Sequence, residues 1–433
     1  MVGGVHLIYR PDLLTPEQRA RVIGLLGAAY GDPPDEWPAN ELDFHRLTAA
    51  GWRPTPFRQI VLKVNSRCNL SCTYCYVYHQ ADQNWRQQPV TMSPAVVEAT
   101  AHRLSAHAKT HELSRMQIIL HGGEPLLAGH DHLRSVVTRF LAAVDDVTAV
   151  EFALQTNGTL IDEMFLELCQ EFGIRVGVSV DGDLAVNDRR RTRRNGSGSH
   201  AAVARGLHLL TSDRFRSVFA GLLCVIDPAS DPVDVYESLL AWRPPSLDLL
   251  LPHGNWTARP PARDSDETST PYADWLGRVF DRWYPAPSHE TDIRLFLEII
   301  SLILGGHSRI ETVGLSPSSV VVVETDGSIE QVDALKSAYH GAASTGLTVT
   351  RNDLDEALRH PGIIARQLGS AALGPECARC PVHRVCGGGY YPHRYQAGSG
   401  FRNRSVYCPD LFALITRIGR QIRADIEKGK AAG

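Results

Sequence analysis

Residues 64–79 read "VNSRCNLSCTYCYVYH" and place Cys68, Cys72 and Cys75 in one short loop. The loop follows "QIVLKVN" (59–65), an apolar run that predicts a buried strand. Thiolates are the usual ligands of iron–sulfur clusters, and a 4Fe–4S cluster takes four ligands. Three cysteines would leave one iron open to another molecule, as at a catalytic metal site. A zinc site and buried free thiols are the alternatives.

The composition is that of an ordinary globular protein. The chain has 433 residues, a formal charge of −4, 43% hydrophobic residues and 21% charged residues. This length suggests a main domain with an appendage, and no basic excess indicates a nucleic-acid or membrane partner. The N-terminus lacks the pattern of a secretory signal, so we expect a cytoplasmic protein. Clustered cysteines in a reducing compartment favour metal ligation over disulfides.

Apolar and amphipathic segments alternate through the middle of the chain. Strands are predicted within 59–65, 116–125, 150–158, 174–182, 217–226 and 247–256, and helices within 93–109, 131–144, 161–173, 200–212, 231–242 and 272–284. This alternation predicts an α/β fold with a parallel sheet. Function in such sheets gathers at the carboxyl ends of the strands. The cysteine loop, "HGGEP" (121–125), "TNG" (156–158), "SVDG" (179–182) and "PHGNW" (252–256) all fall there.

Together, "CNLSCTYC", "GGEP", "TNG" and "SVDG" resemble the radical S-adenosylmethionine (SAM) superfamily over about residues 58–260. The resemblance implies a partial (β/α)6 TIM-type barrel whose open iron chelates SAM. Reductive cleavage of SAM would then give a 5′-deoxyadenosyl radical that abstracts a hydrogen atom.

The resemblance also assigns roles around SAM. Gly122, Gly123 and Glu124 match the motif that receives the methionine amino group, and Tyr74 matches an aromatic residue near the adenine. Asn157 matches a ribose contact, and Ser179 matches a contact to the SAM carboxylate. Arg191, in "NDRRRTRRNG", best fits the spacing of an arginine on the same carboxylate, and most of its arginine neighbours are expected to form a solvated loop.

A second set of thiols lies near the end of the chain. Cys377, Cys380, Cys386 and Cys408 follow the pattern C-x2-C-x5-C-x21-C, which suits a closed iron–sulfur site or a four-cysteine zinc site. The segment resembles the SPASM extension, which in complete form has seven cysteines and two auxiliary clusters. Val332 and Tyr390 stand where two of the missing cysteines would be. We therefore expect two 4Fe–4S clusters, one for SAM and one auxiliary. The isolated Cys169 and Cys224 are expected to be buried and inert.

Three regions are predicted: an N-terminal arm over 1–55 with a possible peptide contact, the barrel over 56–300, and a SPASM/twitch-like auxiliary-cluster domain with a terminal helix over 301–433. A hairpin is predicted within 318–333, around "DG".

The combination of "VVVETDGSIEQVDALK", "LLLPHGNW" and few auxiliary cysteines resembles the FxsB-like cyclophane-forming maturases. Such enzymes join an aromatic side chain to the β-carbon of a nearby residue in a ribosomal precursor peptide, and an external donor such as flavodoxin or ferredoxin would supply electrons. The coupling needs a base, for which Asp181, His253, Asp333 and Glu330 are candidates. We expect His253, Asn255 and Trp256 to face the cavity. Thioether formation, sulfatase maturation and a non-enzymatic iron–sulfur or zinc regulator are the alternatives.

Overall fold

The computed structural model describes residues 42–144, 147–263 and 268–432. Residues 1–41 of the predicted N-terminal arm lie outside these residues. The predicted boundaries at residues 55 and 300, and the peptide contact of residues 1–55, stay predictions. None of the described helices is long and apolar enough to cross a membrane.

The described strands form one sheet in the order β10-β9-β8-β1-β2-β3-β4-β5-β6-β7. Their bounds are β1 Gln59–Asn65, β2 Arg115–Gly122, β3 Ala149–Thr156, β4 Arg175–Ser179, β5 Phe219–Val225, β6 Ser246–Leu250, β7 Asp292–Ile293, β8 Val320–Val323, β9 Ser328–Glu330 and β10 Ser344–Thr348. Strands β1 to β7 run parallel in sequence order. The six predicted strands are confirmed, and the short β7 was not expected.

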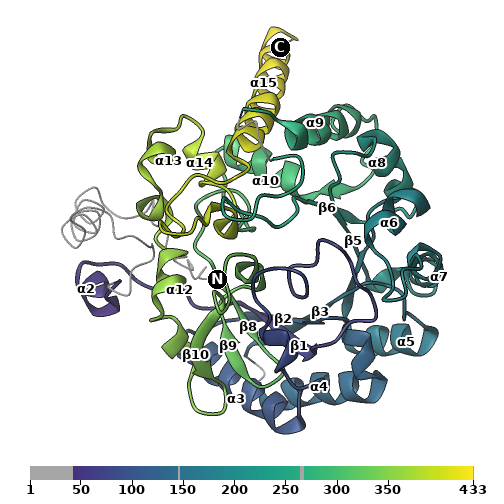
Figure 1. Cartoon of the computed structure of the whole chain (residues 1–433), viewed down its shortest axis with the longest axis vertical. Coiled ribbons are helices and arrows are strands. Elements are labelled where there is room, and N and C mark those ends of the chain that lie inside the picture. Colours follow the sequence, from purple (N-terminus) through teal and green to yellow (C-terminus); the bar gives the residue numbers. More distant parts are fainter. Residues whose placement is uncertain (1–41, 145–146, 264–267, 433) are drawn as a thin grey trace.

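Helices connect the parallel strands and cover the sheet from outside, as Figure 1 shows for α3 to α9 around the curved strands. The described helices are α2 Phe44–Ala49, α3 Pro94–Thr110, α4 His130–Ala143, α5 Glu163–Phe172, α6 Leu184–Arg190, α7 His200–Leu210, α8 Pro232–Leu240, α9 Pro271–Trp283, α10 Arg294–Ile303, α11 Leu354–Ala357, α12 Pro361–Ala365, α13 Pro375–Arg379, α14 His383–Cys386 and α15 Cys408–Ala432. The fold is therefore the predicted α/β partial barrel, with a cysteine-rich C-terminal region.

The ends of these helices follow local sequence signals. The Ser93 hydroxyl accepts a hydrogen bond from Val96 N and caps α3, whose first residue is Pro94. Gly173 ends α5 at φ 64°, a left-handed conformation that costs glycine little.

Helix α6 was not expected, because its arginine-rich sequence was interpreted as a solvated loop. Arg189 and Arg190 instead pair with the buried Asp227, so the loop prediction is wrong for both.

The C-terminal region continues the sheet of the barrel. Strand β8 pairs in parallel with β1, with Gln59 opposite Val320, and β9 pairs antiparallel with β8 as the hairpin signal predicted. This pairing fixes the hairpin and the residues after it beside the loop that follows β1. Residues more than 240 positions apart in sequence can therefore form one site.

Candidate active site

A cavity of about 290 Å³ lies at the carboxyl ends of the barrel strands. We call one side of its lining the cysteine side, which consists of Cys68, Cys72, Cys75, Asn157 and Arg191. The other side, the ring side, consists of Tyr76, His253, Tyr390 and His393. The other lining residues include Gly122, Gly123, Gln155 and Ser179, which come from the ends of β2, β3 and β4.

The three cysteines of the loop after β1 are half-buried and share this cavity. Leu70 N donates to Cys68 Sγ at 3.4 Å, and Asn157 Nδ2 lies 3.7 Å from the same sulfur. Burial raises the pKa of the Cys68 thiol to about 12, and burial also raises the pKa of Cys72 and Cys75. Buried thiolates of this kind need a compensating cation, and a thiolate-bound metal supplies one.

Tyr74, Asp181 and Arg191 form a hydrogen-bonded chain beside the cysteines. The Tyr74 hydroxyl donates to Asp181 Oδ2 at 2.5 Å and accepts from Arg191 Nη1 at 2.7 Å. Asp181 Oδ1 also accepts from Val225 N at 3.0 Å, and Asp181 is absent from the cavity lining. Burial raises the pKa of the Asp181 carboxyl, and the charge of Arg191 opposes that rise. Arg191 Nε is buried without a hydrogen-bond partner, which leaves this donor for an anionic group in the cavity.

Glu124 is fully buried and lies outside the cavity lining. Its carboxylate accepts hydrogen bonds from Thr156 Oγ1 and Asn157 N, both at 2.7 Å, and from Leu126 N at 3.1 Å. These donors tie the ends of β2 and β3 together, so a contact between this carboxylate and a SAM ammonium stays a prediction. A Cβ at Gly122 would lie 2.0 Å from the Asn65 carbonyl oxygen, which is why the end of β2 requires glycine there.

Ser179 and Asn157 lie on the lining, but both already have protein partners. Gln155 Nε2 donates to Ser179 Oγ at 2.9 Å. Asn157 Nδ2 donates to Asn69 Oδ1 at 2.8 Å, and Asn157 Oδ1 accepts from Thr159 N at 3.0 Å. The structure brings both residues to the cavity lining, where their contacts with a bound ligand stay predictions.

The ring side is a cluster of aromatic and imidazole rings. The ring centroid of His253 lies 4.7 Å from that of Tyr76, 5.6 Å from that of His393 and 5.9 Å from that of Tyr390. Burial lowers the pKa of His253 to about 4, and its Nδ1 is buried without a hydrogen-bond partner. His253 is therefore neutral near pH 7 and can accept a proton. Tyr390, at the position of a missing cluster cysteine, contributes its ring to the cavity lining.

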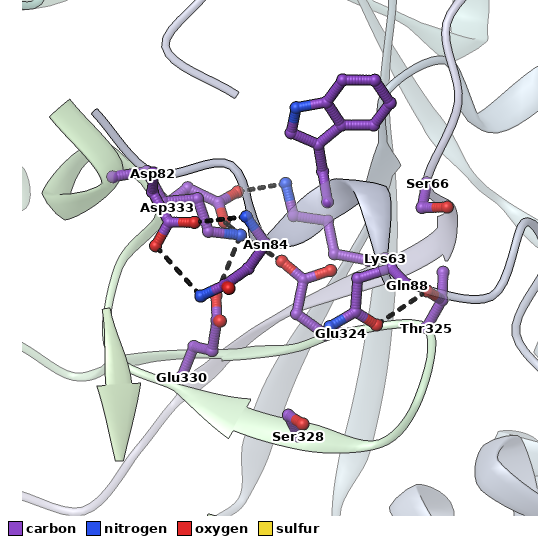
Figure 2. Close-up of polar contacts among 12 residues, drawn as sticks. Lys63, Ser66, Asp82, Asn84, Gln88, Glu324, Thr325, Ser328, Glu330 and Asp333 are labelled. Carbon is purple, nitrogen blue, oxygen red and sulfur yellow. Dashed lines mark hydrogen bonds and ion pairs between the residues drawn. The ribbon is translucent and has the colours of Figure 1, made fainter. Parts of the chain in front are cut away.

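Asp333 belongs to a buried charge network behind the cavity wall. Figure 2 shows Lys63 of β1 reaching Asp333, with Glu324 and Glu330 of the hairpin nearby. Lys336 pairs with Glu324, with Glu330 at 2.9 Å and with Asp333 at 3.5 Å. Burial by itself would raise the pKa of Asp333, but Lys63 and Lys336 together hold it below its usual value.

Lys63 connects this network to the cavity. Its Nζ donates to His121 Nδ1 at 3.2 Å, and His121 is part of the lining. Burial and the charge of Lys63 lower the pKa of His121 to about 3. Sequence reasoning missed His121, Lys63, Lys336 and His393. One signal could have found Lys63, because a charged residue inside an otherwise apolar strand needs a buried partner.

Two residues after β6 do not face the cavity as expected. Asn255 is fully buried and donates to Ser337 O at 2.9 Å. The Trp256 indole donates to Arg404 O at 2.6 Å, and neither residue belongs to the lining. Both predictions are wrong, because backbone carbonyls of the C-terminal region satisfy these polar groups.

The four cysteines near the end of the chain line a separate cavity of about 200 Å³. Cys377 and Cys380 come from α13 and its end, Cys386 ends α14 and Cys408 begins α15. All nine cysteines are free thiols. Four thiols on one cavity lining match in number the donor set of a 4Fe–4S cluster, and also that of a four-cysteine zinc site. Cys169 and Cys224 are buried in the core, as expected.

Comparison with known proteins indicates the class of enzyme. Residues 62–239 match the family described as the Radical SAM superfamily. The matched part of the chain includes the whole cysteine side of the cavity, so the site lies in the part that is similar to radical SAM enzymes.

Two similar proteins match most of the chain. A serine-type anaerobic sulfatase-maturating enzyme of Klebsiella aerogenes is 27% identical over 361 residues, 82% of this chain and 84% of that protein. A cysteine-type anaerobic sulfatase-maturating enzyme of Clostridium novyi is 23% identical over 81% of this chain and 91% of that protein.

Solved structures share the fold. The structure of anSMEcpe with bound AdoMet has a TM-score of 0.72 at 22% identity and covers 84% of this chain and 98% of its own. Streptococcus suis SuiB bound to the precursor peptide SuiA has a TM-score of 0.53 at 15% identity, with 90% and 88% of the two chains covered.

Proposed function

We propose that this protein is a radical SAM maturase that crosslinks an aromatic side chain to the β-carbon of a nearby residue in a ribosomally made precursor peptide. The observation that carries the proposal is one cavity lined both by three metal-competent thiols and by a cluster of neutral rings. The peptide part is supported by similar proteins that mature sulfatases or bind a precursor peptide.

The cysteine side would hold the cofactors. Cys68, Cys72 and Cys75 would hold a 4Fe–4S cluster, and the unpaired Nε of Arg191 would bind the SAM carboxylate. Cluster and SAM, when bound, supply the radical that takes one hydrogen atom from the substrate. Tyr74 and Asp181 orient Arg191 through the chain Arg191 Nη1–Tyr74 hydroxyl–Asp181. Asn157, Ser179 and the Gly122–Gly123 backbone would line the rest of the SAM site.

The crosslink removes two hydrogens from the peptide. One leaves as an atom, and the second leaves as a proton and an electron when the new carbon–carbon bond restores the aromatic ring. His253 is the base best placed for the proton, because it lies on the lining with a free Nδ1. The other candidate bases are less well placed. Asp333 and Glu330 belong to the buried charge network, and the Asp181 carboxylate already accepts hydrogen bonds from Tyr74 and Val225. The electron goes to a one-electron carrier of the flavodoxin or ferredoxin class.

Cys377, Cys380, Cys386 and Cys408 would hold one auxiliary 4Fe–4S cluster. Anaerobic reconstitution should therefore give about eight irons per chain, and Cys380→Ala should reduce that number to about four, because a 4Fe–4S cluster needs its cysteine ligands. Iron analysis with Mössbauer spectroscopy measures both numbers. Zinc in place of half of the iron would contradict the auxiliary cluster and support a structural zinc site.

Sulfatase maturation is the second candidate, because two sulfatase-maturating enzymes match more than 80% of this chain. The two functions differ in their products. A crosslink joins two residues, whereas a sulfatase maturase would alter a single serine or cysteine of its target.

The deciding experiment is coexpression with the short reading frames beside the gene, followed by fragmentation of the peptides in a mass spectrometer. We expect a loss of two hydrogens that maps to an aromatic residue and a neighbour without sulfur. The same loss at a cysteine would indicate a thioether. A change confined to one serine or cysteine of a sulfatase peptide would support the second candidate, and SAM cleavage without any peptide change would overturn the precursor-peptide assignment.

A further inference from the structure

A group of two histidines and one aspartate lies away from both cysteine sites. His107 lies in the last turn of α3, His111 is the residue that caps the end of this helix, and Asp355 belongs to α11 of the C-terminal region. Asp355 Oδ1 lies 2.5 Å from His107 Nδ1 and 2.8 Å from His111 Nε2. Two imidazole nitrogens thus converge on one carboxylate oxygen.

The second nitrogen of His107 is fixed by the backbone. His107 Nε2 lies 3.1 Å from the carbonyl oxygen of Phe57, and the His107 side chain is only 1% exposed. A carbonyl oxygen can only accept, so Nε2 carries a hydrogen and donates it. In the neutral ring this leaves the Nδ1 lone pair aimed at Asp355 and His111. Histidines that bind metals are oriented in this way, with the other ring nitrogen donating to a carbonyl or carboxylate.

We propose that His107 Nδ1, His111 Nε2 and Asp355 Oδ1 bind a divalent transition-metal ion of the zinc class. Two imidazole nitrogens and one carboxylate oxygen are a ligand set that zinc accepts, with water in the fourth position. The exposed fractions of the Asp355 and His111 side chains, 35% and 25%, leave one side of the group open for that water. Any hydrogen that lies between the two rings and the carboxylate leaves as a proton when the ion binds.

The position of the site indicates a structural role. Phe57 precedes β1, and α3 leads into the start of β2, so the group lies at the amino ends of the strands. The cavity lies at the opposite, carboxyl ends. Residues at the amino-end face of such barrels serve stability rather than chemistry.

Other contacts join α3 to the C-terminal region at this amino-end face of the barrel. Arg103 of α3 pairs with Asp353, and Arg103 Nε donates to Val349 O at 3.1 Å. A metal ion at Asp355 would therefore clamp the C-terminal region to the barrel across about 250 residues of chain.

The test measures zinc in the full-length, anaerobically reconstituted enzyme, so that iron occupies the cysteine sites. After addition of Zn²⁺ and desalting, we expect the unmodified protein to retain about one zinc more than His111→Ala or Asp355→Asn, with equal iron. In competition with a zinc indicator, either change should weaken binding by more than about 100-fold, because outer partners of metal sites alone contribute about 10–100-fold. Zn²⁺ should also raise the melting temperature of the unmodified protein only.

His102→Ala is the matched control, because His102 lies on the same helix, exposed and near Glu98 only. It should retain zinc like the unmodified protein. Asp355→Asn preserves the side-chain shape, so the zinc measurement still decides if His111→Ala does not fold. Equal zinc in the unmodified protein and in Asp355→Asn would overturn the proposal. The group would then be a hydrogen-bonded clamp that joins Asp355 to His107 and His111.

Discussion

The two sides of the cavity are built in different ways. On the cysteine side, all groups come from the segments that follow β1, β3 and β4 of the barrel. On the ring side, Tyr76 comes from the loop after β1, His253 from the end of β6, and Tyr390 and His393 from the segment after α14. The ring side therefore exists only when the C-terminal region is packed onto the barrel.

The two sides of the cavity are suited to two different tasks. The cysteine side is built of groups suited to a cluster and a charged cofactor, namely thiols and an unpaired guanidinium nitrogen. The ring side offers uncharged rings, because burial lowers the pKa of both His253 and His393. Changes on the first side should stop SAM cleavage, whereas changes on the second should leave SAM cleavage intact and stop product formation.

The largest effect is expected for Cys72→Ala. Loss of one of three thiols should remove the cluster, and formation of 5′-deoxyadenosine from SAM should fall by more than about 1,000-fold, well beyond the effect of outer partners of a metal site. Chromatography of reactions with a chemical reductant measures this. Cys169→Ala is the control, because Cys169 is buried in α5 away from the cavity. Continued 5′-deoxyadenosine formation by Cys72→Ala would show that the cysteine side does not hold the cluster that cleaves SAM.

His253→Phe tests the ring side. The substitution keeps a ring of similar size against Tyr76 and His393 but removes the proton acceptor. The crosslinked product should fall by about 100-fold or more, the usual contribution of a general base, while SAM cleavage continues. Mass spectrometry of peptide and 5′-deoxyadenosine in one reaction gives both rates. His208→Phe, whose ring packs on Trp242 outside the cavity, is the control. Unchanged product formation would reject His253 as the base.

Arg191→Met should weaken SAM binding without removing the cluster. Loss of one hydrogen bond to a charged group corresponds to about 1.5–3 kcal/mol, or about 10–150-fold in affinity. Equilibrium binding of SAM to reconstituted enzyme measures the change, and iron content shows that the cluster remains. Arg205→Met on α7 is the control, because Arg205 donates only within its own helix. Equal affinity of Arg191→Met and Arg205→Met would mean that the free Nε does not meet the SAM carboxylate.

How much the sequence predicts also differs between the two sides. The six barrel strands, their helices and the positions of the cysteine loop, Asn157 and Ser179 follow from local signals: apolar periodicity, helix caps and strand-end motifs. In a parallel sheet the carboxyl ends of neighbouring strands lie side by side. Motifs at the strand ends therefore predict which residues lie near one another.

Of the ring side, local signals predict His253 in the cavity but none of its partners. Asn255 and Trp256 were expected in the cavity from their place after β6, but their polar groups bind carbonyls of Ser337 and Arg404 in the C-terminal region. The pairing of β8 with β1, which brings Asp333 to Lys63, joins segments without any shared motif. Such contacts depend on tertiary packing, which a pattern within one segment does not encode.

The smallest effect concerns the charge network behind the ring side. Burial raises the pKa of Glu330 to about 8 from an ordinary 4.5, the negative charge of Glu324 adds to the rise, and Lys336 opposes it. Between these two pH values the folded protein holds a proton that the unfolded chain has released. This contribution to stability is complete below pH 4.5 and is lost as the pH rises through about 8.

Glu330→Gln mimics the protonated carboxyl and removes this pH dependence. Between pH 6 and pH 9, the melting temperature of the unmodified protein should therefore fall more steeply than that of Glu330→Gln, by a few degrees at about 2 °C per kcal/mol. Calorimetric scans of both proteins at several pH values measure the difference, with Glu98→Gln on the exposed face of α3 as the control. Parallel pH profiles would show that Glu330 stays ionised beside Lys336. The ring side would then be supported by permanent charge pairs, and the contrast with the thiols of the cysteine side, which need a metal to ionise, would become sharper.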